Sequence, residues 1–136
     1  MNARRLENRV AIVTGAGQGV GEGIARRLSQ EGATVVIAAR RAETGEPVVE
    51  SIRSAGGQAV CIVTDVSVSE SVDACVASSV QQFGRLDIMV HNAFMGGIPH
   101  KLEKAQIEKH WTSMSRTGVW ASLFCAGKCR RFSATS

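Results

Sequence analysis

Residues that could bind a charged ligand are concentrated in a glycine-rich stretch near the N-terminus. Residues 14–21 read Thr-Gly-Ala-Gly-Gln-Gly-Val-Gly and directly follow the apolar run Val10–Val13. Because glycine has no Cβ, such a chain can leave a buried strand, turn sharply and open a helix whose amides face a phosphate. Glycines also mark ordinary turns, but a place between a predicted strand and a predicted helix is the context that a dinucleotide site requires. The stretch therefore predicts nucleotide contacts from Thr14, Gly15, Gln18, Gly19, Val20 and Gly21.

The end of the next predicted strand carries two arginines that bear on the choice of nucleotide. In NAD sites, an acidic residue about 20 positions past the glycines bonds the ribose 2′-hydroxyl. This chain instead reads Ala38-Ala39-Arg40-Arg41. A carboxylate would repel a 2′-phosphate, whereas a guanidinium binds it through two parallel hydrogen bonds. We therefore predict NADP(H) in preference to NAD, with Arg40 as the main contact and Arg41 as the second. The alternative is that both arginines belong to a solvated loop.

Polar residues also follow the third and fourth predicted strands. Asp65-Val66 and Asn92-Ala93 stand at strand ends beside the predicted switch point of the sheet. Open α/β sheets bind their ligands at such a point, so these pairs are expected to meet the adenosine half of the nucleotide. From its spacing alone, Asp65 is about as compatible with a carboxylate that caps a helix.

The hydrophobic period alternates between strand and helix along the chain. Short apolar runs predict strands at 10–13, 34–39, 59–63 and 86–90. Strands separated by helices indicate right-handed crossovers and a parallel sheet. The prediction is one α/β domain over 1–136, with a Rossmann-like parallel sheet of strand order 3-2-1-4 and helices on both faces. A further helix is expected from about Glu103, and an irregular basic tail at about 125–136.

The helices between these strands show their own signals. Val20, Ile24 and Leu28 recur at four-residue spacing, which predicts one apolar face of the first helix. Pro47 suits the first turn of the second helix, and Ser69 is placed to be the N-cap of the third.

Composition narrows the class of protein. No apolar run approaches the ~18 residues of a membrane span, and the N-terminus lacks a secretory apolar segment, which favours a cytoplasmic protein without membrane contact. The net charge of +4 is partly concentrated at the two ends, but no aromatic residues alternate with the charges, so nucleic-acid binding is not predicted. None of the four cysteines forms a Cys-x-x-Cys pair, and we predict neither a disulfide framework nor a metal site.

The order and spacing of these motifs resemble the N-terminal half of a classical short-chain dehydrogenase/reductase, from about Leu6 to about Phe124. The motifs that carry the resemblance are Thr14-Gly15 to Gly21, Asp65-Val66, Leu86-Asp87 and Asn92-Ala93. The resemblance implies hydride transfer between a nicotinamide and an alcohol or ketone carbon, and NADP preference from a basic residue at position 40.

The same resemblance implies roles for individual residues. It places the glycines at 15, 19 and 21 along the pyrophosphate, Asp65 at the adenine amino group and Asn92 beside the ribose.

The chain also departs from the family pattern. His91 and Phe94 replace two residues of the family's Asn-Asn-Ala-Gly stretch, and Ser115 stands where the family has an asparagine. The chain contains no Tyr, so the family's Tyr-x-x-x-Lys is missing, and 125–136 shows no strand pattern. Hydride transfer to a carbonyl needs a proton donor. No catalytic residue is therefore assigned.

These departures lead to the expectation of a truncated oxidoreductase that carries the cofactor-binding half and is inactive alone. An alcohol or ketone would be its substrate only if the chain were completed. The alternative is a non-catalytic NADP-binding or interaction protein that assembles with a full-length relative. Because the fourth strand reads as an interior strand without a fifth beside it, we expect association with a copy of itself or with a related chain.

Overall fold

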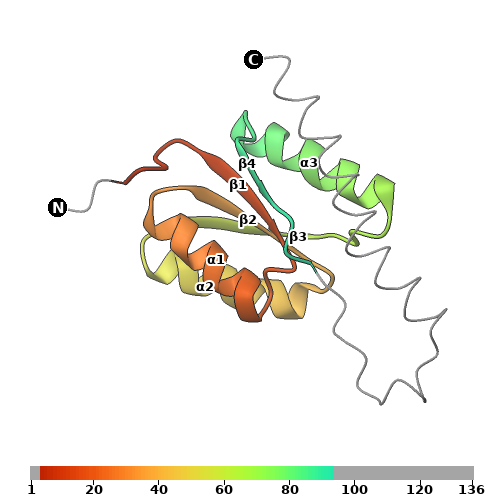
Figure 1. The fold of residues 1–136 in the computed structure, drawn as a ribbon, viewed down its shortest axis with the longest axis horizontal. Helices are drawn as coiled ribbons and strands as arrows, with labels where there is room; N and C mark the ends of the chain where they lie inside the picture. Colours follow the sequence, from red (N-terminus) through yellow and green to blue (C-terminus); the bar gives the residue numbers. More distant parts are fainter. Residues whose placement is uncertain (1–3, 94–136) are drawn as a thin grey trace, which may run out of the picture.

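The computed structural model describes residues 4–93, which form one parallel sheet with helices packed on it (Figure 1). The strands are β1 (Val10–Thr14), β2 (Thr34–Ala39), β3 (Gln58–Val63) and β4 (Ile88–Val90). The helices are α1 (Gly19–Gln30), α2 (Ala42–Ser54) and α3 (Ser69–Phe83). The strands pair in the order β3-β2-β1-β4, so the predicted Rossmann-like topology is confirmed.

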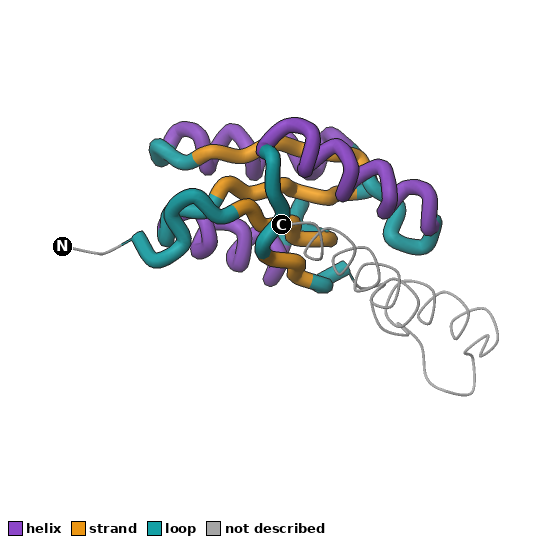
Figure 2. The backbone as a smooth tube through the Cα atoms, turned by 90° about the horizontal axis from the view of Figure 1, so that it is seen from above, coloured by secondary structure: helices purple, strands orange, loops and turns teal. Residues whose placement is uncertain are grey.

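Helices cover both faces of the sheet (Figures 1 and 2). One cluster of buried side chains joins Val13 to Val49 on the face under α1 and α2. A second joins Ile12 to Val76 on the face under α3. Neighbouring residues of β1 thus point into opposite cores, and β1 is buried along its whole length. This is why its sequence is a continuous apolar run rather than an alternating one.

The parallel register determines which strand ends lie together. Val13 pairs with Ile37 of β2 on one side and with Val90 of β4 on the other. Ala39 in turn pairs with Val63 of β3. Because parallel strands all point the same way, their carboxyl ends meet at one edge of the sheet. The polar segments that follow the strands therefore begin at that edge.

One residue of the predicted apolar face of the first helix, Val20, does not face the core. Val20 is 74% exposed, whereas Gly21 and Ala25 are buried and Ile24 and Leu28 pack against the core. The buried residues have the spacing i, i+3, i+4 and i+7, which forms one stripe of a helix. Val20 lies at the margin of that stripe, in the first turn of α1.

Two predicted helix starts are also corrected. α2 begins at Ala42, so Pro47 lies inside the helix and not in its first turn. A proline there removes the single hydrogen bond that would reach back to the carbonyl of Glu43, and its ring is exposed. α3 begins at Ser69 itself, with Val68 in the N-cap position and no side-chain cap bond.

The fourth strand is shorter than predicted. It begins at Ile88, because Asp87 instead exchanges hydrogen bonds with Val10: the Asp87 carboxylate accepts from the Val10 amide at 2.9 Å, and the Asp87 amide donates to the Val10 carbonyl at 3.0 Å. The residues of β4 are half-buried. The helix expected from Glu103 and the basic tail expected at 125–136 lie outside the described residues.

Candidate functional site

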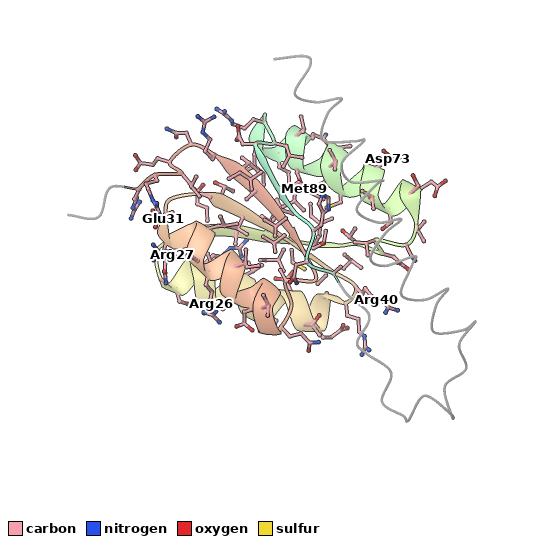
Figure 3. All side chains as sticks on the ribbon, in the orientation of Figure 1. Arg26, Arg27, Glu31, Arg40, Asp73 and Met89 are labelled. Atoms are coloured by element: carbon pink, nitrogen blue, oxygen red, sulfur yellow. The ribbon has the colours of Figure 1, made fainter. Side chains whose placement is uncertain are left out.

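The predicted site residues come together at the carboxyl edge of the sheet. The glycine loop follows β1, Arg40 follows β2, Asp65 follows β3 and Asn92 follows β4. In Figure 3, Arg40 lies at this edge, whereas Arg26, Arg27 and Glu31 lie at the other end of the molecule. This edge contains the switch point, since the chain leaves β1 toward β2 on one side while β4 pairs on the other. Open α/β sheets bind ligands there.

Thr14 and Asn92 join the end of β1 to the end of β4. The buried Thr14 hydroxyl donates to the Val90 carbonyl at 3.3 Å and accepts from the amides of Asn92 and Ala93, each at 3.1 Å. The Asn92 side-chain amide donates to the carbonyls of Thr14 and Gly15, each at 3.2 Å. These two side chains were predicted to contact the nucleotide, and the structure shows that their polar groups also hold the glycine loop against the end of β4.

Two glycines allow this close approach. Gly15 has φ +64°, and a Cβ added there would lie 2.8 Å from the Ala93 Cα. A Cβ at Gly21 would collide with the Asn92 side-chain nitrogen and the Gly15 carbonyl oxygen. Any larger residue at either position would separate the loop from Asn92 or distort α1.

The outer side of the bend is open. Gln18, Gly19 and Val20 are exposed. Gly19 has φ +58°, and a Cβ added there would meet nothing within 4 Å. The first amides of a helix have no acceptor within the helix, and the helix dipole concentrates positive charge at this end. The start of α1 thus offers donors and space to an anionic group, which fits the pyrophosphate of a dinucleotide.

Arg40 and Arg41 supply positive charge at the same edge. Both are exposed, and within residues 4–93 neither guanidinium makes an ion pair. The five ion pairs of the described chain engage other arginines: Arg5, Arg9, Arg26, Arg27 and Arg85. Exposed guanidinium groups at the end of β2 are suited to a phosphate, because binding it breaks no ion pair with the part of the chain that the structure describes.

Asp65 stabilises the turn between β3 and α3. One carboxylate oxygen accepts hydrogen bonds from the Ser67 hydroxyl at 2.6 Å and the Ser67 amide at 2.9 Å. The hydrogen bonds from Ser67 lower the pKa of Asp65, and the positive charge of Arg40 adds to the effect. Asp65 therefore has a structural role in this turn, but it does not cap α3, whose N-cap position is Val68 without a side-chain cap bond. Its carboxylate is ionised at neutral pH.

The remaining predicted contacts are less open to a ligand. Val66 is buried, with 4% of the residue exposed. Ala93 is half-buried and donates its amide to Thr14. The structure also brings Gly17 and Thr44 together beside the arginines, a contact that was not predicted from the sequence. Gly17 lies between the glycines of the predicted spacing, and no sequence signal connected it to Thr44.

Other kinds of site are not found in the described part of the chain. Among residues 4–93, no group of histidine, cysteine and acidic side chains is arranged to hold a metal ion. Cys61 and Cys75 are free thiols, and burial raises the pKa of each. No helix described by the structure is long and apolar enough to cross a membrane.

Comparisons with known proteins show which protein family this chain resembles. The family model for short chain dehydrogenases matches residues 9–132. The short-chain reductase protein NovJ of Streptomyces niveus is 44% identical over 117 residues, which are 86% of this chain and 44% of NovJ. The short chain dehydrogenase/reductase astE of Aspergillus oryzae is 39% identical over 122 residues, which are 88% of this chain and 46% of astE. The chain thus spans about half the length of these relatives.

Solved structures match in the same way. A metagenomic short-chain oxidoreductase in complex with NADP superposes with a TM-score of 0.83 at 32% identity, covering 91% of this chain and 56% of the other. A short-chain type dehydrogenase/reductase from Mycobacterium marinum gives a TM-score of 0.86 at 26% identity, covering 95% of this chain and 51% of the other.

Proposed function

This chain belongs to the short-chain dehydrogenase/reductase family of oxidoreductases, and we propose that it is the NADP(H)-binding half of such an enzyme. The observation that carries the proposal is the open bend at Gly19, with two exposed arginines at the same edge of the sheet that make no ion pair within residues 4–93. When bound, the nicotinamide would exchange a hydride with an alcohol or ketone carbon.

In this proposal each residue contacts or supports a different part of the nucleotide. The amides at the start of α1, from Gly19 to Gly21, hold the pyrophosphate, and the glycine at 15 lets the loop lie close to it. Asn92 keeps the loop in place from the end of β4 while facing the ribose. The ionised Asp65 accepts from the adenine amino group. In this arrangement the positions 18, 20, 66 and 93 complete the walls of the site.

The proposed choice of NADP(H) over NAD(H) rests on the end of β2. The residues after Ala39 are both arginines, and no carboxylate stands at the position where NAD sites hold one. Arg40 is the main proposed partner of the 2′-phosphate and Arg41 the second. The NADP complex of the metagenomic relative agrees with this choice.

We carry a second candidate function from another class. The chain contains no Tyr, so it lacks the phenol that the family uses as acid and base. A non-catalytic NADP-binding protein that assembles with a full-length relative would need only the site described above. Turnover separates the two candidates, because both bind NADPH.

The test of the cofactor proposal is a titration of the 136-residue chain with NADPH and with NADH. Charged hydrogen bonds contribute about 1.5–3 kcal/mol, so we expect NADPH to bind roughly tenfold to a hundredfold more tightly. Arg40→Asp should remove this preference, because the new carboxylate repels the 2′-phosphate. Arg4→Asp is the matched control, since Arg4 is exposed beside Gly32, before β2 begins. Equal affinities in the unaltered chain would contradict the proposal.

A further inference from the structure

The glycine loop and the segment that carries Arg40 and Arg41 approach each other closely at Gly17 and Thr44. Gly17 of the loop lies against Thr44 in the first turn of α2: a Cβ added to Gly17 would lie 2.8 Å from the Thr44 Oγ1 and 3.0 Å from its Cβ. The backbone of Gly17 does not have the positive φ found at Gly15 and Gly19. Glycine is therefore required at position 17 by the space that Thr44 occupies and not by the backbone conformation.

Thr44 in turn holds the backbone of Arg41. Its hydroxyl donates to the Arg41 carbonyl at 2.9 Å, and the amides of Thr44 and Gly45 donate to the same oxygen, each at 3.3 Å. The first turn of α2 and the Arg40–Arg41 segment thus move together. Through Thr44, that segment is placed directly against the glycine loop.

The side of this turn that faces the sheet leaves little room for adjustment. Gly45 is buried against β2 and β3, where an added Cβ would lie 3.2 Å from the Ala39 Cβ and would collide with the Cys61 sulfur. If a side chain at position 17 pushed Thr44 away, α2 could not withdraw into the sheet. The displacement would instead carry Thr44 and the Arg41 carbonyl outward, away from the loop.

We propose that Gly17 and Thr44 are positioning residues that set the spacing between the pyrophosphate loop and the arginines, and so determine the preference for a 2′-phosphorylated dinucleotide. This inference rests on the proposed function, because it assigns a role within that site. NADH and NADPH share the pyrophosphate and differ at the 2′-position. A change in this spacing therefore weakens NADPH and leaves NADH nearly unaffected.

The test is a double-mutant cycle on the 136-residue chain, with Gly17→Ala, Thr44→Gly and the double variant. Each protein is titrated with NADPH, NADH and adenosine 2′,5′-bisphosphate, and its thermal unfolding is recorded. We expect Gly17→Ala to weaken NADPH and the bisphosphate about tenfold, a change typical of a displaced contact, with NADH altered less than about twofold. Gly23→Ala is the control, since an added Cβ there meets nothing within 4 Å.

The second arm of the cycle distinguishes a specific contact from general damage. In the Thr44→Gly background the Oγ1 and Cβ atoms are gone and the backbone carbonyl carbon at position 44, 3.2 Å from the added Cβ, remains, so Gly17→Ala should cause a clearly smaller further loss of NADPH affinity. Additive losses, or equal losses of NADPH and NADH, would overturn the inference. An unaltered chain that binds both nucleotides equally, or neither, would contradict the proposed function as well. A chain whose preference for NADPH is as large after Gly17→Ala as before it would overturn this inference alone.

Discussion

At the scale of single residues, Thr14 makes the most long-range polar contacts of the site. Its buried hydroxyl donates a hydrogen bond to the Val90 carbonyl and accepts from the amides of Asn92 and Ala93. The sequence placed Thr14 correctly, at the entrance of the glycine loop, but did not indicate that its hydroxyl is used inside the protein. A hydroxyl's partners depend on which strand lies beside it, and that strand is far away in the chain.

We predict that Thr14→Val destabilises the protein by about 1–3 kcal/mol, because it leaves buried donors and an acceptor without their partner. Urea unfolding followed by circular dichroism measures the loss. Thr14→Ser keeps the hydroxyl and should lose much less. If the valine variant proves as stable as the parent chain, the hydroxyl does not join β1 to β4.

At the scale of elements, Glu31 at the end of α1 connects the helix to the N-terminal segment. Its carboxylate accepts hydrogen bonds from Arg5 at 2.9 and 3.0 Å and also pairs with Arg27. The hydrogen bond from the Arg5 guanidinium is the largest cause that lowers the pKa of Glu31, to about 2. No residue pattern in the sequence indicated this pairing, because Arg5 precedes β1 and reaches Glu31 only after α1 has folded back along the sheet.

The lowered pKa of Glu31 predicts a dependence of stability on pH. A carboxyl whose pKa is lower in the folded than in the unfolded state adds stability above its unfolded pKa. That contribution is lost as the pH falls toward the folded pKa, here from the ordinary 4.5 toward about 2. The difference in melting temperature between the parent chain and Glu31→Gln should therefore shrink across this range.

The partner residue provides an independent check. Arg5→Gln removes the guanidinium that bonds Glu31. In an Arg5→Gln background, the effect of Glu31→Gln on the melting temperature should therefore depend less on pH. A difference between parent and Glu31→Gln that stays constant from pH 5 to pH 2 would contradict the assignment.

At the scale of the whole molecule, the described residues bring the predicted binding groups to one edge, while the chain spans about half the length of its curated relatives. Binding and turnover are therefore separable properties. In the proposed function the amides and arginines of the site bind the nucleotide, but a carbonyl that receives a hydride also needs a proton.

We predict that the 136-residue chain binds NADPH without oxidising it in the presence of ketones. Binding should raise the melting temperature with the logarithm of the nucleotide concentration once that exceeds Kd. The absorbance of NADPH at saturating ketone should fall no faster than without protein. A full-length relative assayed in parallel controls for the choice of ketones. Protein-dependent oxidation would favour the catalytic candidate and would point to another proton donor, such as His110 or Lys109.

The sequence by itself determined the family, the strand order and the edge of the sheet at which the candidate site residues lie. These follow from the alternation of strand and helix periods and from the glycine spacing, both of which are local in the chain. Only the tertiary structure decided that Val20 is exposed, that Thr14 and Asn92 join β1 to β4, and that Gly17 meets Thr44. Those contacts depend on how closely elements that are distant in sequence pack against each other. The local periodicity of the sequence does not indicate that packing distance.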